Sequence, residues 1–274
     1  MLNLKGGVGK THAVWLFAAV CQERSRRVLV IDLDPQANLT GSFLAATETQ
    51  PGVEVLFDPA ADHDPHTLVR RTAFEHIDVI PAGPTLAQYD LADQQQWERA
   101  DLHLSLVDAI ATLRPHYDFI VLDCPPRLSL VSFAALCAAD GVLIPLEAAD
   151  WGAQGIVKVA SAIEYVQQRF NANLTLLGYL VSRFKRARAY QRSYLGQLRK
   201  HFGYRAFDTV IPDLARFEKS VTDRVPITLF TPGSIEAGIA RRFFAEVRLR
   251  AERVRGGGTA GRRSRVHTGV VAAA

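Results

Sequence analysis

Short runs of apolar, often β-branched residues alternate with longer amphipathic stretches along this chain of 274 residues. Such nearly continuous apolar runs are typical of strands covered on both faces of a sheet. The expected strands are Arg27–Asp34, His76–Gly83, Tyr117–Pro126, Gly141–Glu147, Leu174–Ser182 and Phe207–Pro212. The expected helices are Lys10–Glu23, Leu102–Leu113, Leu128–Ala138, Ala153–Phe170, Gln191–Phe202 and Ile235–Val254. The alternation predicts an α/β fold, with a mostly parallel, twisted sheet and helices on both of its faces.

The pattern predicts one domain over residues 1–254. Residues 255–274 are rich in Gly and Arg and lack periodicity, so we expect a disordered tail. No apolar run has the length that spans a bilayer. The three cysteines have no metal-ligand spacing, which favours reduced thiols and a cytoplasmic location.

Charge is distributed unevenly between the two halves. Residues 1–150 contain 10 Lys and Arg against 20 Asp and Glu, a net charge of −10. Residues 151–274 contain 22 against 8, a net charge of +14. This asymmetry indicates that the C-terminal half meets a polyanion.

A glycine-rich loop, "LKGGVGKTH", lies close to the start of the sequence. The usual phosphate loop reads G-x-x-x-x-G-K-[ST], and here Leu4 stands in place of the first glycine. The three remaining glycines still allow a tight turn that aims backbone N–H groups at phosphate oxygens. Lys10 is then expected to contact the β- and γ-phosphates of a nucleotide, and the Thr11 hydroxyl to bind Mg²⁺. The segment expected to line the nucleotide is Gly6, Gly7, Val8, Gly9, Lys10, Thr11 and His12.

Lys5 adds a second lysine to the loop, and the resulting K-G-G-V-G-K-T resembles the deviant Walker-A P-loop ATPases of the ParA/MinD type. The resemblance implies ATP and Mg²⁺ as ligands. It also implies a homodimer formed across the nucleotides, in which Lys5 reaches the nucleotide of the partner subunit and acts like an arginine finger. His12 stands where such ATPases usually have a second threonine, and we expect it to be structural.

Further segments extend the resemblance over about residues 3–254. The stretch "VLVIDLDPQANLTGSF" resembles the switch region of these ATPases. This implies that Asp34 orients the attacking water and that Asp32 supports the Mg²⁺ shell. "FIVLDCPPRLS" resembles their Walker-B strand, which implies that Asp123 reaches Mg²⁺ through water. Pro212 and Asp213 are expected near adenine.

The basic half favours a ParA/Soj-type partition ATPase within this superfamily. Residues 183–207 contain no acidic residue, and such clusters bind DNA phosphates without sequence specificity. The candidate DNA contacts are Arg183, Lys185, Arg186, Arg188, Arg216 and Lys219. The resemblance implies a nucleoid-associated ATPase that partitions a plasmid or chromosome and is stimulated by a ParB-like partner.

Three alternatives remain open from the sequence. The ATPase could position another protein cargo on the nucleoid, or it could be a MinD-like membrane-associated regulator. The glycine-rich tail lacks the apolar face of an interfacial helix, so we do not expect a membrane partner. The third alternative is a non-hydrolysing DNA scaffold, which would have no need of Asp34.

The loop also stands unusually close to the start of the sequence. Relatives carry an apolar strand before it, whereas only Met1–Asn3 precede it here. We expect either that this start is internal to the coding sequence or that a short strand presents the loop.

Overall fold

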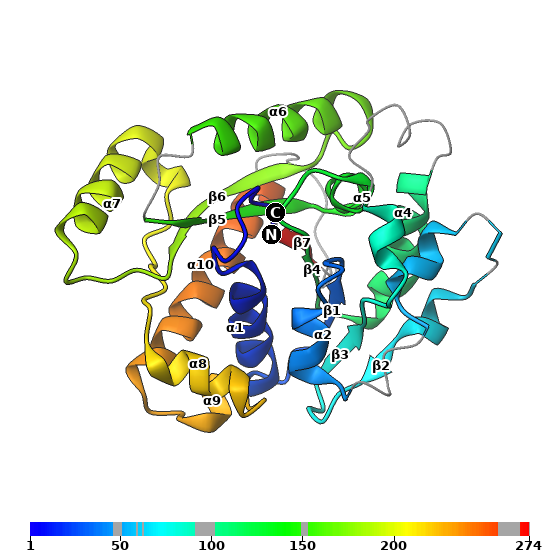
Figure 1. The fold of residues 1–274 in the computed structure, drawn as a ribbon, viewed down its shortest axis with the longest axis horizontal. Coiled ribbons are helices and arrows are strands. Elements are labelled where there is room, and N and C mark those ends of the chain that lie inside the picture. Colours follow the sequence, from blue (N-terminus) through cyan, green and yellow to red (C-terminus); the bar gives the residue numbers. More distant parts are fainter. Residues whose placement is uncertain are drawn as a thin grey trace.

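The part of the chain that the structure describes forms one seven-stranded sheet, seen in Figure 1 with its covering helices. The structure is a computed structural model that describes residues 1–45, 51–58, 60–61, 63–90, 102–148, 153–256 and 269–273. The strands are β1 (Val28–Asp32), β2 (Arg70–Arg71), β3 (Ile77–Ile80), β4 (Phe119–Asp123), β5 (Gly141–Glu147), β6 (Thr175–Ser182) and β7 (Gly269–Ala273). Their order is β2-β3-β1-β4-β7-β5-β6, and every pair except β2–β3 is parallel. The predicted α/β fold is confirmed.

Helices link the strands, as the sequence pattern predicts. The α-helices are α1 (Lys10–Glu23), α2 (Asn38–Phe43), α4 (Leu102–Leu113), α5 (Leu130–Ala138), α6 (Ala153–Arg169), α7 (Ala189–Phe202), α8 (Ala215–Thr222), α9 (Ile227–Phe230) and α10 (Ile235–Gly256). Short 3-10 helices occupy Val53–Phe57, Pro65–Leu68, Leu86–Tyr89, Arg114–His116 and Gly203–Arg205. None of the helices within the described ranges is both long and apolar enough to cross a membrane.

The sheet separates two hydrophobic cores. Side chains on a strand alternate between its faces, so Val28 and Val30 pack in one core with α1 and α10, while Leu29 and Ile31 pack in the other with α4 and α5. All five residues of β1 are buried. Burial on both faces explains the continuous apolar runs of the sequence.

The run Phe207–Pro212 does not form the strand that its sequence predicts. Phe207 and Ile211 donate backbone hydrogen bonds to Tyr179 and Val181 of β6, at 2.8 and 2.9 Å, but the pairing is limited to isolated bridges, Tyr179 with Ala206 and Phe184 with Pro212. The reason lies in α10, where the Glu246 carboxylate accepts the backbone N–H groups of residues 208 and 209, each at 2.8 Å. These donors are therefore unavailable to a β-ladder.

The tail also differs from its prediction. α10 continues to Gly256, and residues 269–273 form β7, which inserts between β4 and β5. The apolar sequence of these residues suits a central strand paired on both sides. The amino group of Met1 donates a hydrogen bond to the carbonyl of Leu122 at 3.0 Å, while Ala273 pairs with Asp123. The two ends of the chain therefore lie side by side, as Figure 1 shows. Residues 257–268 lie outside the described residues.

Candidate nucleotide-binding site

The glycine loop lies at the carboxyl edge of the sheet and leads directly into α1. Gly7 has a φ of 77° and Gly9, which precedes the helix, a φ of 85°. Such left-handed angles favour glycine because it has no Cβ. The helix therefore begins with backbone N–H groups that no side chain caps, and its positive dipole end faces the loop. This geometry is suited to an anion.

The end of β6 packs directly against the loop. A Cβ atom on Gly9 would lie 3.0 Å from the Ser182 hydroxyl oxygen, which is too close for an ordinary contact. The Ser182 hydroxyl donates a hydrogen bond to the carbonyl of Val8. Arg183 donates to the carbonyl of Gly7 at 3.2 Å. Sequence reasoning missed Ser182, although its place at the end of a predicted parallel strand is where site residues gather.

Asp32 holds the segment after β1 in place through hydrogen bonds. Its side chain is fully buried and accepts hydrogen bonds from the Thr40 backbone and hydroxyl, both at 2.8 Å, and from the Asp34 backbone at 3.1 Å. Burial raises the pKa of Asp32 above its ordinary value, and the nearby Asp123 carboxylate adds to the rise. Asp32 therefore shapes the segment that carries Asp34. Thr40 lies in the switch-like motif, but its residue type alone gave no role.

Lys10 and Asp123 form the centre of the site. Lys10 is only 6% exposed, and burial lowers its pKa while the carboxylates of Asp123 and Asp34 oppose that shift. Burial raises the pKa of Asp123, and Lys10 is among the cations that counter this rise. Among the described residues, both carboxylate oxygens of Asp123 are buried without a hydrogen bond of ordinary geometry, and the Met1 amino group and the Thr11 hydroxyl oppose the rise in its pKa. A buried carboxylate left without such a bond fits a divalent cation, so Asp123 and the adjacent Thr11 could hold Mg²⁺.

Lys5 lies on the surface of the loop. Its ammonium group is 3.6 Å from a carboxylate oxygen of Glu147, the last residue of β5. The Lys5 side chain remains 48% exposed, whereas Lys10 is buried. The two lysines of the loop therefore face different environments. Sequence reasoning gave Glu147 no role, although it also ends a predicted strand.

His12, Pro212 and Asp213 lie on the β6 side of the loop. The His12 ring is 5.1 Å from the ring of Phe217, and burial lowers the pKa of His12 to about 4. The Asp213 carboxylate forms an ion pair with the Lys185 ammonium at 3.0 Å. The negative charge of Asp213 opposes the lowering of the His12 pKa.

The candidate DNA contacts fall into three groups. Arg183 contacts the loop, as described above. The second group consists of cations already held in ion pairs: Lys185 with Asp213 at 3.0 Å, Arg216 with Glu236 at 3.1 Å and Lys219 with Asp223 at 2.9 Å. Arg186 and Arg188 are exposed just before α7. The guanidinium of Arg188 also lies over the ring of Tyr190 and donates to its hydroxyl at 2.7 Å.

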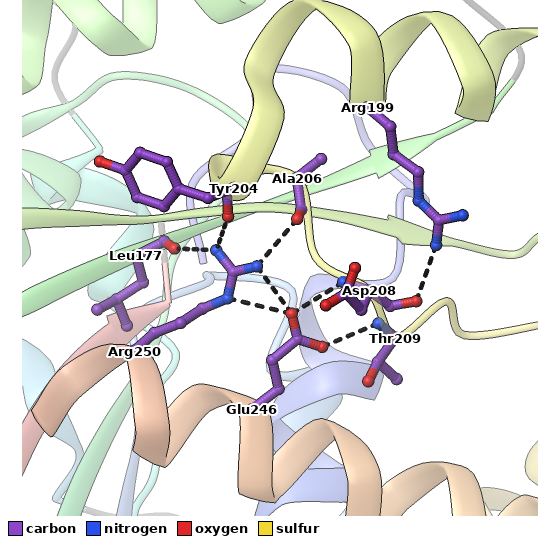
Figure 2. A network of polar contacts seen from close by, with 8 residues as sticks. All are labelled: Leu177, Arg199, Tyr204, Ala206, Asp208, Thr209, Glu246 and Arg250. Carbon is purple, nitrogen blue, oxygen red and sulfur yellow. Dashed lines mark hydrogen bonds and ion pairs between the residues drawn. The ribbon is translucent and has the colours of Figure 1, made fainter. Parts of the chain in front are cut away.

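Part of the basic charge on α10 is engaged in contacts within the protein, as Figure 2 shows for Arg250. Arg250 donates to the carbonyls of Leu177, Tyr204 and Ala206, at 3.0, 2.6 and 2.9 Å. It also pairs with Glu246 at 2.8 Å. Arg241 likewise pairs with Glu23, on α1. The charge of the C-terminal half is thus smaller at its surface than in its sequence.

Known proteins resemble this chain in both sequence and fold. Residues 1–176 match the AAA domain family. The chromosome partitioning protein ParA of Myxococcus xanthus (strain DK1622) is 32% identical over 230 residues, which cover 83% of this chain and 79% of that protein. The sporulation initiation inhibitor protein Soj of Bacillus subtilis (strain 168) is 30% identical over 234 residues, covering 85% and 90%. Among solved structures, cobyrinic acid a,c-diamide synthase from Mycobacterium smegmatis, with a bound ATP analogue and magnesium, is 31% identical with a TM-score of 0.73, covering 92% and 94%.

The parallel sheet and the glycine loop opening α1, with its buried lysine, define the class of P-loop ATPases. The chain belongs to the AAA domain family and, within it, to the ParA/Soj-type partition ATPases. The fold and the family predicted from the sequence are both confirmed.

Proposed function

We propose that this protein binds ATP with Mg²⁺, dimerises across the nucleotides and holds DNA nonspecifically until a ParB-like partner stimulates hydrolysis. It would thereby act in the cytoplasm, on the nucleoid, to partition a plasmid or chromosome. The names of its relatives support the partition role, and the nucleotide analogue and magnesium of the solved synthase support the ligands.

The observation that carries the proposal is the buried Lys10 beside two carboxylates at the mouth of an uncapped helix. Lys10 would neutralise phosphate charge in a low-dielectric site, together with the N–H groups of the loop. Thr11 and Asp123 would hold Mg²⁺, directly or through water. Mg²⁺ supplies charge neutralisation of the phosphates when bound.

Asp34 is suited to orient the attacking water. It is half-buried next to Lys10, and one of its oxygens accepts the Gln36 backbone N–H at 3.0 Å. The hydrogen bonds of Asp32 fix the direction in which this segment leaves β1. Phosphoryl transfer depends mainly on such positioning. Asp34 therefore argues for hydrolysis rather than a non-hydrolysing scaffold.

Lys5 is the residue suited to a partner subunit. Its exposed ammonium forms an ion pair with Glu147 at 3.6 Å. Such an exposed ion pair is weak, so an incoming phosphate could replace Glu147 as its partner. In a dimer formed face to face, Lys5 would add a cation to the partner's nucleotide.

The exposed face of α7 is suited to DNA. Together with the preceding loop and the 3-10 helix that follows, it presents a set of exposed cations, which are Arg186, Arg188, Arg192, Arg199, Lys200 and Arg205. Within the described part of the chain, the guanidinium groups of Arg188, Arg192 and Arg199 donate to nearby carbonyls or a tyrosine hydroxyl and form no ion pair with an acid. Phosphates would be attracted independently of sequence.

DNA binding with ATP, ADP or no nucleotide, at two salt concentrations, tests the proposal. We expect binding that requires ATP, weakens with salt and is lost in Lys10→Ala. The double variant Arg186→Ala/Arg188→Ala should flatten the slope of log affinity against log salt by up to about 2. Lys219→Ala, in which the lost cation is already paired with Asp223, is the matched control and should change little.

The remaining outcomes separate the alternatives. DNA binding without nucleotide would contradict the ATP switch. ATP binding without DNA binding would favour another cargo or a membrane. The apolar face of α10 formed by Ile239, Phe243, Phe244 and Val247 is buried in the core, which argues against its insertion into a membrane. Pelleting with liposomes tests that outcome directly.

A further inference from the structure

The first basic residue after β6 points to the nucleotide site rather than to the α7 surface. Arg183 donates a hydrogen bond through its Nη1 atom to the carbonyl of Gly7, 176 residues earlier in the chain, at 3.2 Å. The neighbouring Ser182 hydroxyl donates to the carbonyl of Val8. Two consecutive side chains therefore hold two consecutive carbonyls of the phosphate loop.

The backbone of Arg183 has an unusual conformation. Its φ of 51° lies in the left-handed region, which only four non-glycine residues adopt within the described part of the chain. A residue with a Cβ is strained there unless its surroundings hold it. The guanidinium is exposed to solvent, yet it turns back onto Gly7 instead of extending outward. Residues with a strained backbone cluster at functional sites, where the surrounding structure holds them.

These contacts restrict the orientation of the loop peptides. A peptide whose carbonyl is held on one side points its N–H group to the other. Gly7 and Gly9 are flexible residues that many other backbone conformations would suit, so the loop needs external contacts to stay in one of them. Gly9 also rests against Ser182, with only 3.0 Å available for a Cβ atom. The end of β6 thus forms a rigid support for the loop.

We propose that Ser182 and Arg183 are positioning residues of the phosphate-binding loop, which they hold ready for the phosphates of ATP. Arg183 then belongs to the nucleotide site, and the DNA surface begins with Arg186. The inference rests on the proposed ATP binding and is independent of the proposed DNA binding. The positive charge of Arg183 also reaches the first turn of α1, where it contributes to the lowered pKa of His12.

Replacing Arg183 by Gly separates positioning from a merely structural role. Glycine accepts the left-handed backbone without strain, which offsets the entropy that it adds to the unfolded chain, so Arg183→Gly should unfold at about the same temperature as the parent protein. The same variant should bind a fluorescent ATP analogue about tenfold more weakly, since one hydrogen bond to a charged donor is lost. The Michaelis constant for ATP should rise in proportion, with little change in kcat. Arg183→Lys, which keeps a cationic donor, should recover part of the affinity.

Matched variants complete the experiment. Arg224→Gly removes another exposed arginine whose backbone is left-handed, with a φ of 54°, and should leave the affinity for the ATP analogue unchanged. Ser182→Ala should also weaken the affinity, by removal of the second contact. The inference is overturned if Arg183→Gly binds the analogue as tightly as the parent protein. It is also overturned if Arg224→Gly loses as much affinity, because general charge would then explain both results.

The failure of the proposed function gives a different result. If the parent protein itself does not bind the ATP analogue, the assignment of an ATP site is wrong. If it binds the analogue and its affinity is unaffected by Arg183→Gly, only the positioning role is wrong.

Discussion

Replacing Arg250 by Met tests whether the basic charge of α10 stabilises the fold or serves DNA. Met keeps the aliphatic bulk and the helical preference of the residue and removes the guanidinium group. The carbonyls of Leu177, Tyr204 and Ala206 would lose their donor. The Glu246 carboxylate would lose its cation, while it still accepts the backbone N–H groups of residues 208 and 209 (Figure 2).

The expected decrease in the free energy of unfolding is about 3–5 kcal/mol, as for the removal of one partner of a buried ion pair. The side chains of Arg250 and Glu246 are only 12% and 13% exposed, so solvent screens their interaction weakly. The guanidinium also lies 4.0 Å from the centre of the Phe207 ring, and this cation–π contact is part of the loss. The decrease is large against a total stability of about 5–15 kcal/mol.

Urea unfolding followed by circular dichroism measures the effect. With a slope of about 2 kcal/mol per molar urea, the midpoint should fall by about 1.5–2.5 M. Arg248→Met is the matched control on the same helix. Arg248 pairs with Glu252, but the two side chains are 41% and 59% exposed, so the expected loss is only about 0.3–0.5 kcal/mol.

Equal midpoints for Arg250→Met and Arg248→Met would refute the reasoning. The polar network of Figure 2 would then contribute nothing to stability, and Arg250 would be available for DNA. A large loss of stability confined to Arg250→Met would instead assign this arginine to the fold.

Three further predictions concern the site and the sheet. Asp34→Ala should retain binding of the ATP analogue and lose hydrolysis, because Asp34 is assigned only to orienting the attacking water. A phosphate-release assay beside a binding titration checks this, and unchanged hydrolysis would contradict the assignment. The pKa of His12 is lowered from 6.5 to about 4, so the unfolded chain binds a proton below pH 6.5 that the folded protein takes up only near pH 4. The free energy of unfolding should therefore fall as the pH drops through this window, by up to about 3 kcal/mol more in the parent protein than in His12→Thr, and parallel pH curves for the two would contradict it. Val271→Pro removes a backbone donor from β7, which is paired on both sides, and should lower the melting temperature; an unchanged melting temperature would mean that β7 contributes little.

Much of the fold could be predicted because it depends on local pattern. The bounds of α1 and α4 agree with the sequence prediction at both ends, because each helix is a stretch of mostly apolar residues that local pattern reveals. The run Phe207–Pro212 has equally good strand character, yet the Glu246 carboxylate takes two of its backbone donors. Glu246 lies 37 residues beyond Thr209, and no local pattern reveals such a competitor.

The candidate site shows the same division. The glycine loop, Lys10 and Asp123 were predictable from motifs, because their roles depend on residue type at fixed spacing and at strand ends. Ser182 carries no such signal, since a serine at the end of a strand is compatible with many roles. Arg183 was assigned to DNA because its neighbours in sequence are basic, whereas its contact is with Gly7.

By itself the sequence determined the class of fold, the phosphate loop and the asymmetry of charge, since apolar periodicity and residue type encode these features. Only the tertiary structure decided which charges remain at the surface. Arg241 pairs with Glu23, 218 residues away, and Arg250 donates hydrogen bonds to the carbonyls around β6. It also decided that β7 fills the space between β4 and β5. The physical reason is that a side chain or strand edge is satisfied by whatever the fold brings next to it, and those partners are distant along the chain.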